Sequence, residues 1–215
     1  MKKTGPEGKA RLSSPLLILI SAPSGGGKTT LCQQLLQRHP DMVRAVTCTT
    51  RSPRPGEVEG RDYYFIDSDA YARRLNAGDF LEHANVYNHC YAIPRNELLD
   101  KLRSGKDVLL NVDVQGAQTV CRRAAEDTEL SRALVSVFLT PASLAVLETR
   151  LKRRATDSPE DLARRLSLAR QEVEHWSQFQ YLIISTSIAE DVRQMEAIID
   201  AERLRQSRST FDFGG

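Results

Sequence analysis

The feature that most constrains the fold lies near the N-terminus, where an apolar run leads into a glycine-rich loop. Residues 16–20 are aliphatic without interruption, residues 20–30 read ISAPSGGGKTT, and a helical pattern follows. Glycines let the backbone curl so that several N–H groups point at one anion, and the N-terminus of the next helix adds positive charge. A buried strand, such a loop and a helix in this order are typical of a nucleotide-binding α/β unit.

The loop fits the P-loop spacing with Ala22 in its first position, followed by Gly27, Lys28 and Thr29. We expect Lys28 to reach the β- and γ-phosphates of a nucleoside triphosphate and the Thr29 hydroxyl to bind Mg²⁺. The bland alternative is a strand-to-helix turn with an incidental lysine. The residues predicted to bind the triphosphate are Ala22, Pro23, Ser24, Gly25, Gly26, Gly27, Lys28, Thr29 and Thr30.

Beyond the loop, apolar runs alternate with helical patterns. The runs are nearly continuously apolar, as expected for strands buried on both faces. This alternation predicts an α/β fold in which helices cover both faces of a parallel sheet. Residues 47–91 do not show this alternation, and we interpret them as a loop-rich inserted lobe. The predicted strands are residues 16–21, 107–112, 133–140 and 181–184, and the predicted helices are residues 29–39, 115–126, 143–154, 159–176 and 188–205.

Composition excludes several classes of protein. The 215 residues include 30 Lys and Arg against 28 Asp and Glu, so the formal net charge is only +2. A dedicated nucleic-acid or membrane-surface binder would carry a large basic excess. Hydrophobic residues make up 40% of the chain, enough for a sizeable core. We see no signal peptide, and the four cysteines lack paired or metal-ligand spacing, which favours free thiols in a reducing cytoplasm.

A second motif, TTRSPRPGEVEGRDYYF at residues 49–65, points to an anionic acceptor. Arg51 and Arg54 are three residues apart and their segment is held by Pro53 and Pro55, so both can converge on one anion. The planar guanidinium suits a doubly charged phosphate because it bonds bidentately, and Tyr63 adds a hydroxyl. Glu57 either contacts the ligand or braces the arginines. The bland alternative is a solvated charged loop.

With these residues in place, the chain closely resembles the guanylate kinase family over nearly everything from about residue 16 to residue 200. The resemblance implies that Glu82 accepts hydrogen bonds from N1–H and N2–H of guanine. Adenine offers a bare C2–H beside an acceptor nitrogen, so a carboxylate in a closed pocket would reject AMP. The residues that we assign to the GMP site are Thr47, Arg51, Arg54, Glu57, Tyr63, Glu82, Tyr91 and Asn111.

Two further regions complete the predicted site. Asn111 and Asp113 follow a buried strand, where ligands gather in open α/β sheets. Similar kinases show Asp-x-Asp there, so Asn111 removes one charge and Asp113 becomes the candidate for the outer shell of Mg²⁺. Residues 150–170 carry seven basic and three acidic side chains, a net +4. The resemblance implies that this segment is a lid whose Arg154 and Arg165 contact the phosphates, with Arg150 a weaker candidate.

The chain departs from the family at four more positions. Ile93 replaces a hydroxyl residue that helps to bind guanine O6, which costs about 1 kcal/mol for one neutral hydrogen bond. Ser185 and Thr186 replace an Asn-Asp pair near the adenine, for which we expect a small effect. Ala155 replaces a lid glycine, which stiffens the hinge slightly.

The resemblance implies an enzyme that converts ATP and GMP to ADP and GDP, with dGMP a further acceptor and Mg²⁺ as cofactor. Lys28, Arg54, Arg154 and Arg165 are the predicted catalytic residues. We expect small-molecule partners only, no nucleic acid or membrane, a cytoplasmic location and a monomer or homodimer.

Two alternatives stay open: a kinase for another acceptor, and an inactive interaction module. The predicted divisions are a tail at 1–14, a kinase domain at 15–205 with core segments 15–46, 95–140 and 177–205, a GMP lobe at 47–94, a lid with flanking helices at 141–176, and a tail at 206–215.

Overall fold

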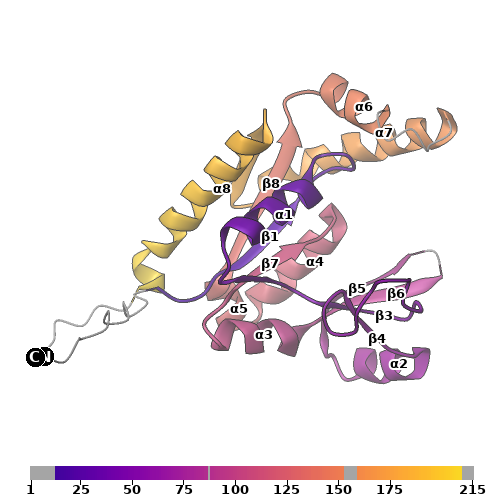
Figure 1. The fold of residues 1–215 in the computed structure, drawn as a ribbon, viewed down its shortest axis with the longest axis vertical. Coiled ribbons are helices and arrows are strands. Elements are labelled where there is room, and N and C mark those ends of the chain that lie inside the picture. Colours follow the sequence, from indigo (N-terminus) through magenta and orange to yellow (C-terminus); the bar gives the residue numbers. More distant parts are fainter. Residues whose placement is uncertain (1–12, 87, 153–158, 210–215) are drawn as a thin grey trace, which may run out of the picture.

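The computed structural model describes residues 13–86, 88–152 and 159–209, and its centre is a parallel five-stranded sheet (Figure 1). The strand order is β2-β7-β1-β8-β9 and all neighbouring pairs are parallel, so the chain must cross over the sheet between its strands. Apolar strands buried on both faces produce this arrangement, as the sequence predicts. The strands are β1 (Leu17–Ser21), β2 (Met42–Arg44), β7 (Asp107–Asn111), β8 (Leu134–Pro141) and β9 (Tyr181–Ser185).

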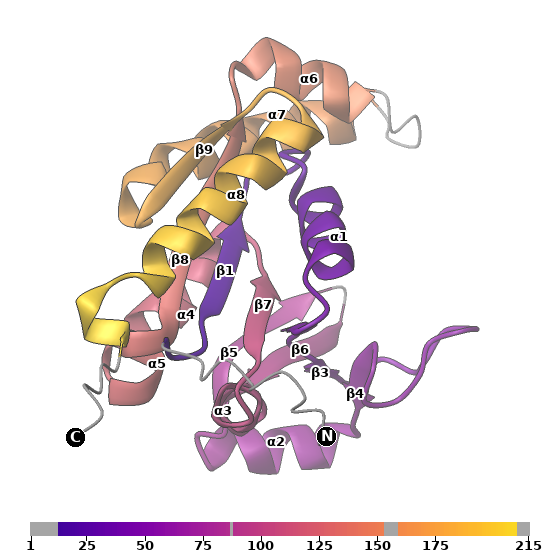
Figure 2. The same cartoon turned by 60° about the vertical axis from the view of Figure 1, so that its left-hand side comes forward.

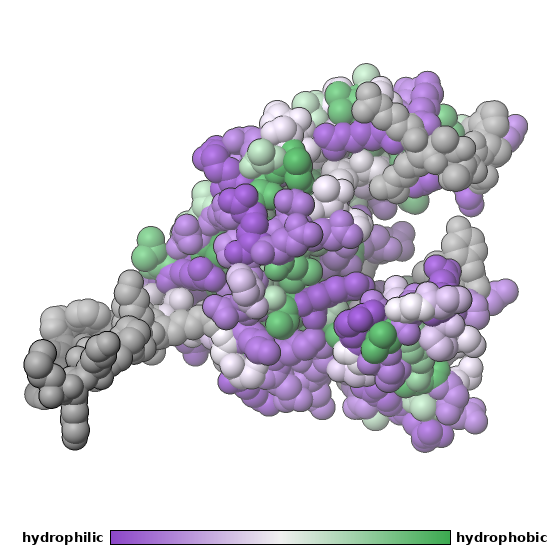
Figure 3. Space-filling view, viewed as in Figure 1, coloured by the Kyte–Doolittle hydropathy of each residue, from purple (hydrophilic) through white to green (hydrophobic). Residues whose placement is uncertain are grey.

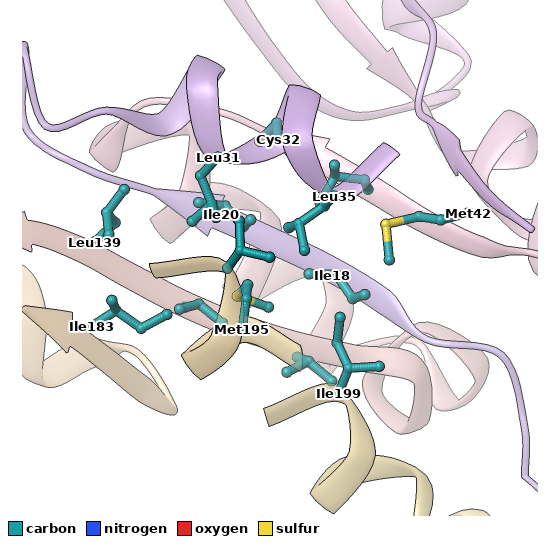
Figure 4. Packing of buried hydrophobic residues seen from close by; sticks show 14 of the residues in the cluster. Ile18, Ile20, Leu31, Cys32, Leu35, Met42, Leu139, Ile183, Met195 and Ile199 are labelled. Atoms are coloured by element: carbon teal, nitrogen blue, oxygen red, sulfur yellow. The ribbon is translucent and has the colours of Figure 1, made fainter. Parts of the chain in front are cut away.

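Helices cover both faces of this sheet (Figures 1 and 2). Because side chains alternate along a strand, Ile18 and Ile20 of β1 pack against α1 (Lys28–Arg38) and α8 (Ile188–Arg203), in the core shown in Figure 4. Leu17 and Leu19 point the other way, to the helices on the opposite face. Those helices are α3 (Arg95–Arg103), α4 (Val114–Ala125) and α5 (Thr128–Ala133).

A second, four-stranded sheet lies beside the first, with the order β4-β3-β6-β5. Helix α2 (Ser68–Asn76) covers it, with a small core of Cys48, Tyr71, Phe80 and Ala92. Both prolines and two of the three glycines of the predicted loop-rich segment lie within residues 50–62, which form no helix or named strand, but the strands around them were not predicted. Two of these strands span three residues each, too few to show an alternating pattern. The strands are β3 (Thr47–Thr49), β4 (Tyr63–Phe65), β5 (Phe80–Val86) and β6 (His89–Pro94). Strand β2 and helices α3 and α5 were also not predicted.

Helices α6 (Leu144–Lys152) and α7 (Pro159–Val173) form a pair beyond the carboxyl edge of the main sheet (Figure 1). Leu147, Leu151 and Ala169 are their buried contacts. The helix predicted over residues 159–176 ends early: α7 stops at Val173, and Trp176 is 48% exposed in a short 3-10 turn, Glu174–Gln178.

The predicted C-terminal tail begins with ordered residues. Gln206–Arg208 form a 3-10 turn, and the buried Arg208 donates to the carbonyls of Ala133 and Leu134 and pairs with the buried carboxylate of Glu202. The sequence shows no periodicity here because the anchor is a single side chain. In the described part of the chain, no helix is long and apolar enough to cross a bilayer.

Candidate active site

A hollow separates the α6–α7 pair from the second sheet (Figure 3). The carboxyl ends of the parallel strands β1 and β7 lead into it, which is where ligands bind in open α/β sheets. Two groups of residues face this region. One surrounds the phosphate loop, and the other lines a cavity against the second sheet.

The phosphate loop follows β1 directly and ends at α1, in the order that the sequence predicts. Gly25 and Gly27 have φ of 83° and 104°, which L side chains rarely adopt. At Gly26 a Cβ would lie 2.7 Å from the Cβ of Ala22, so the loop has no room for a side chain there. Lys28 folds back, and its Nζ donates to the Ala22 carbonyl at 2.9 Å.

Helix α7 touches this loop at Ser24. The Ser24 N–H donates to Oε2 of Glu172 at 3.0 Å, and Nη2 of Arg165 donates to the Ser24 hydroxyl at 3.2 Å. Burial raises the pKa of the Glu172 carboxyl, while the Ser24 N–H and the charge of Lys28 act against that rise. Arg165 therefore lies at the loop, as the lid prediction requires, whereas Arg154 falls outside the described residues.

Glu172 was not singled out in the sequence, although a signal existed. It follows Arg165 by two helical turns, so both side chains project from the same face of α7. Glu172 is half-buried and lies just beyond residues 150–170, the segment singled out for its basic charge.

On the other side of the hollow, a cavity of about 210 Å³ lies between the second sheet and the ends of β7 and α4. It brings together residues that are far apart in the sequence. Gly116 and Ile93 complete the wall, and the first of these was not singled out. The predicted residues that line the cavity are Thr47, Tyr63, Glu82, Tyr91, Asn111 and Asp113.

Glu82 is the acid of this cavity. Its burial, together with the nearby charge of Asp113, raises its pKa to about 7, and Arg123 acts against this. Strand pairing sets Glu82 opposite the buried Ile93, an apolar neighbour that offers the carboxylate no hydrogen bond. A Cβ on Gly116 would lie 3.6 Å from Cδ of Glu82, so the glycine leaves the space beside the acid open.

The arginine segment meets the cavity at Tyr63, which lines it. Nη2 of Arg51 donates to both oxygens of Glu57, at 2.8 and 3.0 Å, and the Arg54 N–H donates to Oε2 at 2.7 Å. Glu57 therefore braces the arginines, the second of the two roles left open by the sequence. The Arg51 guanidinium lies 5.5 Å from the ring centroid of Tyr63, a cation–π contact.

Arg51 retains donor capacity in this position. Its Nε is buried and has no hydrogen-bond partner in the described part of the chain, which suits a site that awaits an anion. Neither arginine lines the cavity itself. Arg51 is connected to it through the ring of Tyr63, whereas the Arg54 side chain is exposed.

Thr29 and Asp113 are the two residues predicted to contact Mg²⁺. Thr29 is exposed in the first turn of α1, beside the loop. Asp113 caps α4, where its Oδ1 accepts from the Gly116 N–H at 2.7 Å, which leaves Oδ2 as the atom that could accept from a metal-bound water. No group of three or more His, Cys, Asp or Glu side chains in the described residues could hold a metal alone. The donor set thus fits a hard cation held chiefly by phosphates.

Comparisons with known proteins agree with this geometry. The sequence model of the guanylate kinase family matches residues 14–202. Among curated relatives, the guanylate kinase of Paramagnetospirillum magneticum is 40% identical over 193 residues, which cover 90% of this chain and 87% of that one. That of Nitrobacter winogradskyi is 41% identical over 195 residues, covering 91% and 86%. The crystal structure of the guanylate kinase from Anaplasma phagocytophilum superposes with a TM-score of 0.67 at 31% identity, covering 92% and 91% of the two chains.

Proposed function

Because this chain belongs to the guanylate kinase family, we propose that it carries out the family's reaction with the residues described above. An oxygen of the GMP phosphate attacks the γ-phosphorus of ATP. The bond to the β–γ bridging oxygen breaks, and ADP and GDP leave. The acceptor phosphate is already anionic, so no protein nucleophile is needed, and positioning supplies most of the catalysis.

One observation carries the choice of acceptor: Glu82 is a half-buried acid in a small cavity that faces the phosphate loop across the hollow. Guanine offers two adjacent donors, N1–H and N2–H, that can satisfy both carboxylate oxygens. Adenine offers none at these positions, and an unpaired carboxylate in a closed pocket is costly. The donors of Arg51, Tyr63 and Tyr91 are grouped at the same end of the second sheet and suit the GMP phosphate.

The phosphate loop supports the ATP half of the proposal. Its positive-φ glycines direct backbone N–H groups toward one anion, and Lys28 supplies a charge at the same place. Arg165 already lies at the loop and adds positive charge where it develops on the transferring phosphoryl group. Arg154 and Arg54 are assigned the same role by resemblance, and Thr47 and Asn111 remain proposed GMP contacts.

We assign Mg²⁺ to the Thr29 hydroxyl and, through water, to Asp113. When bound, the ion neutralises charge on the β- and γ-phosphates. Thr29 and the loop hold the phosphates in place, and α6 and α7 exclude water when they close over them. We also propose that the chain acts in the cytoplasm, where both nucleotides are found, as a monomer or homodimer.

A substrate panel tests the proposal. Purified protein is assayed with ATP and each of GMP, dGMP, AMP, CMP and UMP in a coupled assay for ADP. We expect GMP to give the highest kcat/KM, with dGMP second. Ile93 opposite Glu82 is the observation that favours another acceptor, because it cannot donate to guanine O6. Fastest turnover with a nucleotide that lacks guanine would overturn the assignment.

A further inference from the structure

A buried carboxylate near the phosphate loop has no part in the scheme above. Asp191 lies in the first turn of α8 and is 4% exposed. Its Oδ2 accepts from the Ser185 hydroxyl at 2.7 Å, whereas its Oδ1 is buried with no hydrogen-bond partner among the residues that the structure describes. Such a group is expensive to bury unless its charge is used.

Ser185, which donates to Asp191, also contacts Arg150. It is the last residue of β9 and is likewise 4% exposed. Nη2 of Arg150 donates to its hydroxyl at 3.2 Å. Arginine can only donate and an ionised carboxylate can only accept, so the single hydroxyl proton must point to Asp191 and a lone pair must point to Arg150. The hydroxyl thus links a buried anion to a guanidinium.

The other end of the Arg150 guanidinium reaches the phosphate loop. Its Nη1 lies 3.4 Å from the Gly26 carbonyl and would lie 3.7 Å from a Cβ on Gly27. Helix α6, which carries Arg150, is packed against the same loop, since a Cβ on Gly25 would come within 2.8 Å of Leu151 Cδ2. The cation is therefore located beside the backbone that turns around the proposed phosphate site.

We propose that Asp191 and Ser185 are positioning residues that hold the Arg150 guanidinium at the phosphate loop for ATP binding. A long side chain that must be ordered at each turnover loses part of its binding contribution, and a fixed partner removes that loss. The buried charge of Asp191 acts through the serine, because a polarised hydroxyl is a stronger acceptor. The inference rests on the proposed ATP site but not on the identity of the acceptor.

The direct test is Ser185→Ala, which deletes the link without adding bulk. We expect the KM for ATP to rise about tenfold, the loss typical of a hydrogen bond to a charged group. The KM for GMP should stay within about twofold, because Ser185 lies outside the acceptor cavity. Ser185→Thr keeps the hydroxyl and should restore most of the ATP affinity.

A matched control is available two residues away. The Ser187 hydroxyl caps α8 by accepting from the Glu190 N–H at 3.2 Å and has no contact with Arg150. Ser187→Ala should lower the melting temperature yet leave the KM for ATP unchanged. Equal KM values for ATP in the two alanine variants would overturn the proposal, since the effect would then be one of stability alone.

Two further measurements test whether Ser185 and Asp191 act through Arg150. In an Arg150→Ala background, Ser185→Ala should raise the KM for ATP no further, whereas additive effects would contradict a shared pathway. Calorimetric titration with a non-hydrolysable ATP analogue, without acceptor, should show the same loss of affinity in Asp191→Asn and Ser185→Ala. This readout holds even if the panel identifies another acceptor. If Asp191→Asn does not fold, Ser185→Ala alone decides the outcome.

Discussion

The two halves of the proposed active site are built in different ways. The ATP half depends on one short segment, Ala22 to Thr30, in which the backbone supplies most of the donors and glycine makes the turns possible. The acceptor half is a cavity assembled from the second sheet, the end of β7 and the start of α4, and its donors and acceptors are side chains. The first half is therefore fixed by local structure, whereas the second depends on tertiary packing and on the charge state of single residues.

Both halves contain a carboxyl group whose pKa is raised by burial, but the two acids face opposite tasks. Glu172 accepts from a loop N–H, at Ser24, where an anionic phosphate would otherwise find a donor. Glu82 stands opposite Ile93 in a cavity that a base with two donors could fill. Burial of a carboxyl group therefore serves two purposes here: Glu172 connects α7 to the loop, and Glu82 is suited to recognise a ligand.

We expect the largest effect on activity from a substitution in the loop proposed to bind ATP. Lys28→Ala removes the charge that the loop holds beside the Ala22 carbonyl. We expect kcat to fall by about a hundredfold or more, because stabilisation of the transferring phosphoryl group is lost. Lys152, on α6 and paired with Glu148, provides a control, and Lys152→Ala should leave kcat unchanged. Normal turnover of the Lys28 variant would refute its role.

A smaller effect is expected when the acceptor half loses its charge. Glu82→Gln keeps the size of the side chain but offers one acceptor and one donor, so guanine is recognised less well and adenine is rejected less strongly. We expect the ratio of kcat/KM for GMP over AMP to fall by at least about tenfold. His83→Gln, the exposed neighbour on β5, should keep the ratio. An unchanged ratio in the Glu82 variant would remove the base-recognition assignment.

The pH dependence of GMP binding follows from the same residue. The pKa of Glu82 is raised to about 7, so the carboxyl becomes protonated and loses its acceptors as pH falls through that value. The KM for GMP should therefore increase by about tenfold between pH 8 and pH 6, the change expected when GMP binds only the ionised form of a carboxyl with this pKa. The same profile measured on Glu82→Gln corrects for titration of the GMP phosphate and should be much flatter. Identical profiles in the two proteins would show that Glu82 does not titrate in this range.

The smallest effect concerns stability. A carboxyl whose folded pKa lies above its unfolded value of 4.5 binds more protons when folded. Stability is therefore lost as pH rises from about 4.5 to about 7. Glu82→Gln should accordingly melt a few degrees higher than the parent at pH 8, with little difference near pH 4.5. A variant that is less stable at pH 8 would show that the acid is already satisfied by the protein.

What the sequence could predict follows the same division. The glycine-rich turn between β1 and α1, the four predicted strands of the main sheet and the helices beside them were confirmed, because apolar runs and glycine spacing are local signals. The second sheet was missed, since β3 and β4 span only three residues each and burial along the longer β6 does not alternate. Glu57 could be read as a ligand contact or as a brace until the distances to Arg51 and Arg54 were known.

Other features could not be predicted because their partners are distant in the chain. The proposed role of Asp191 depends on its contact with Ser185 and, through it, with Arg150, which come from β9 and α6. Arg208 looked like part of an irregular tail, yet its guanidinium is buried against the carbonyls of Ala133 and Leu134. A charged residue in a short aperiodic segment carries no sequence signal of burial.

The central claim is that one acid recognises the purine while a separate loop binds the triphosphate. A crystal structure of the protein with GMP and a non-hydrolysable ATP analogue tests it most directly. We predict that guanine N1–H and N2–H donate to the Glu82 carboxylate and that the analogue's phosphates lie on the loop between Gly25 and Thr30. A base turned away from Glu82, or two nucleotides that compete for one pocket, would contradict the account.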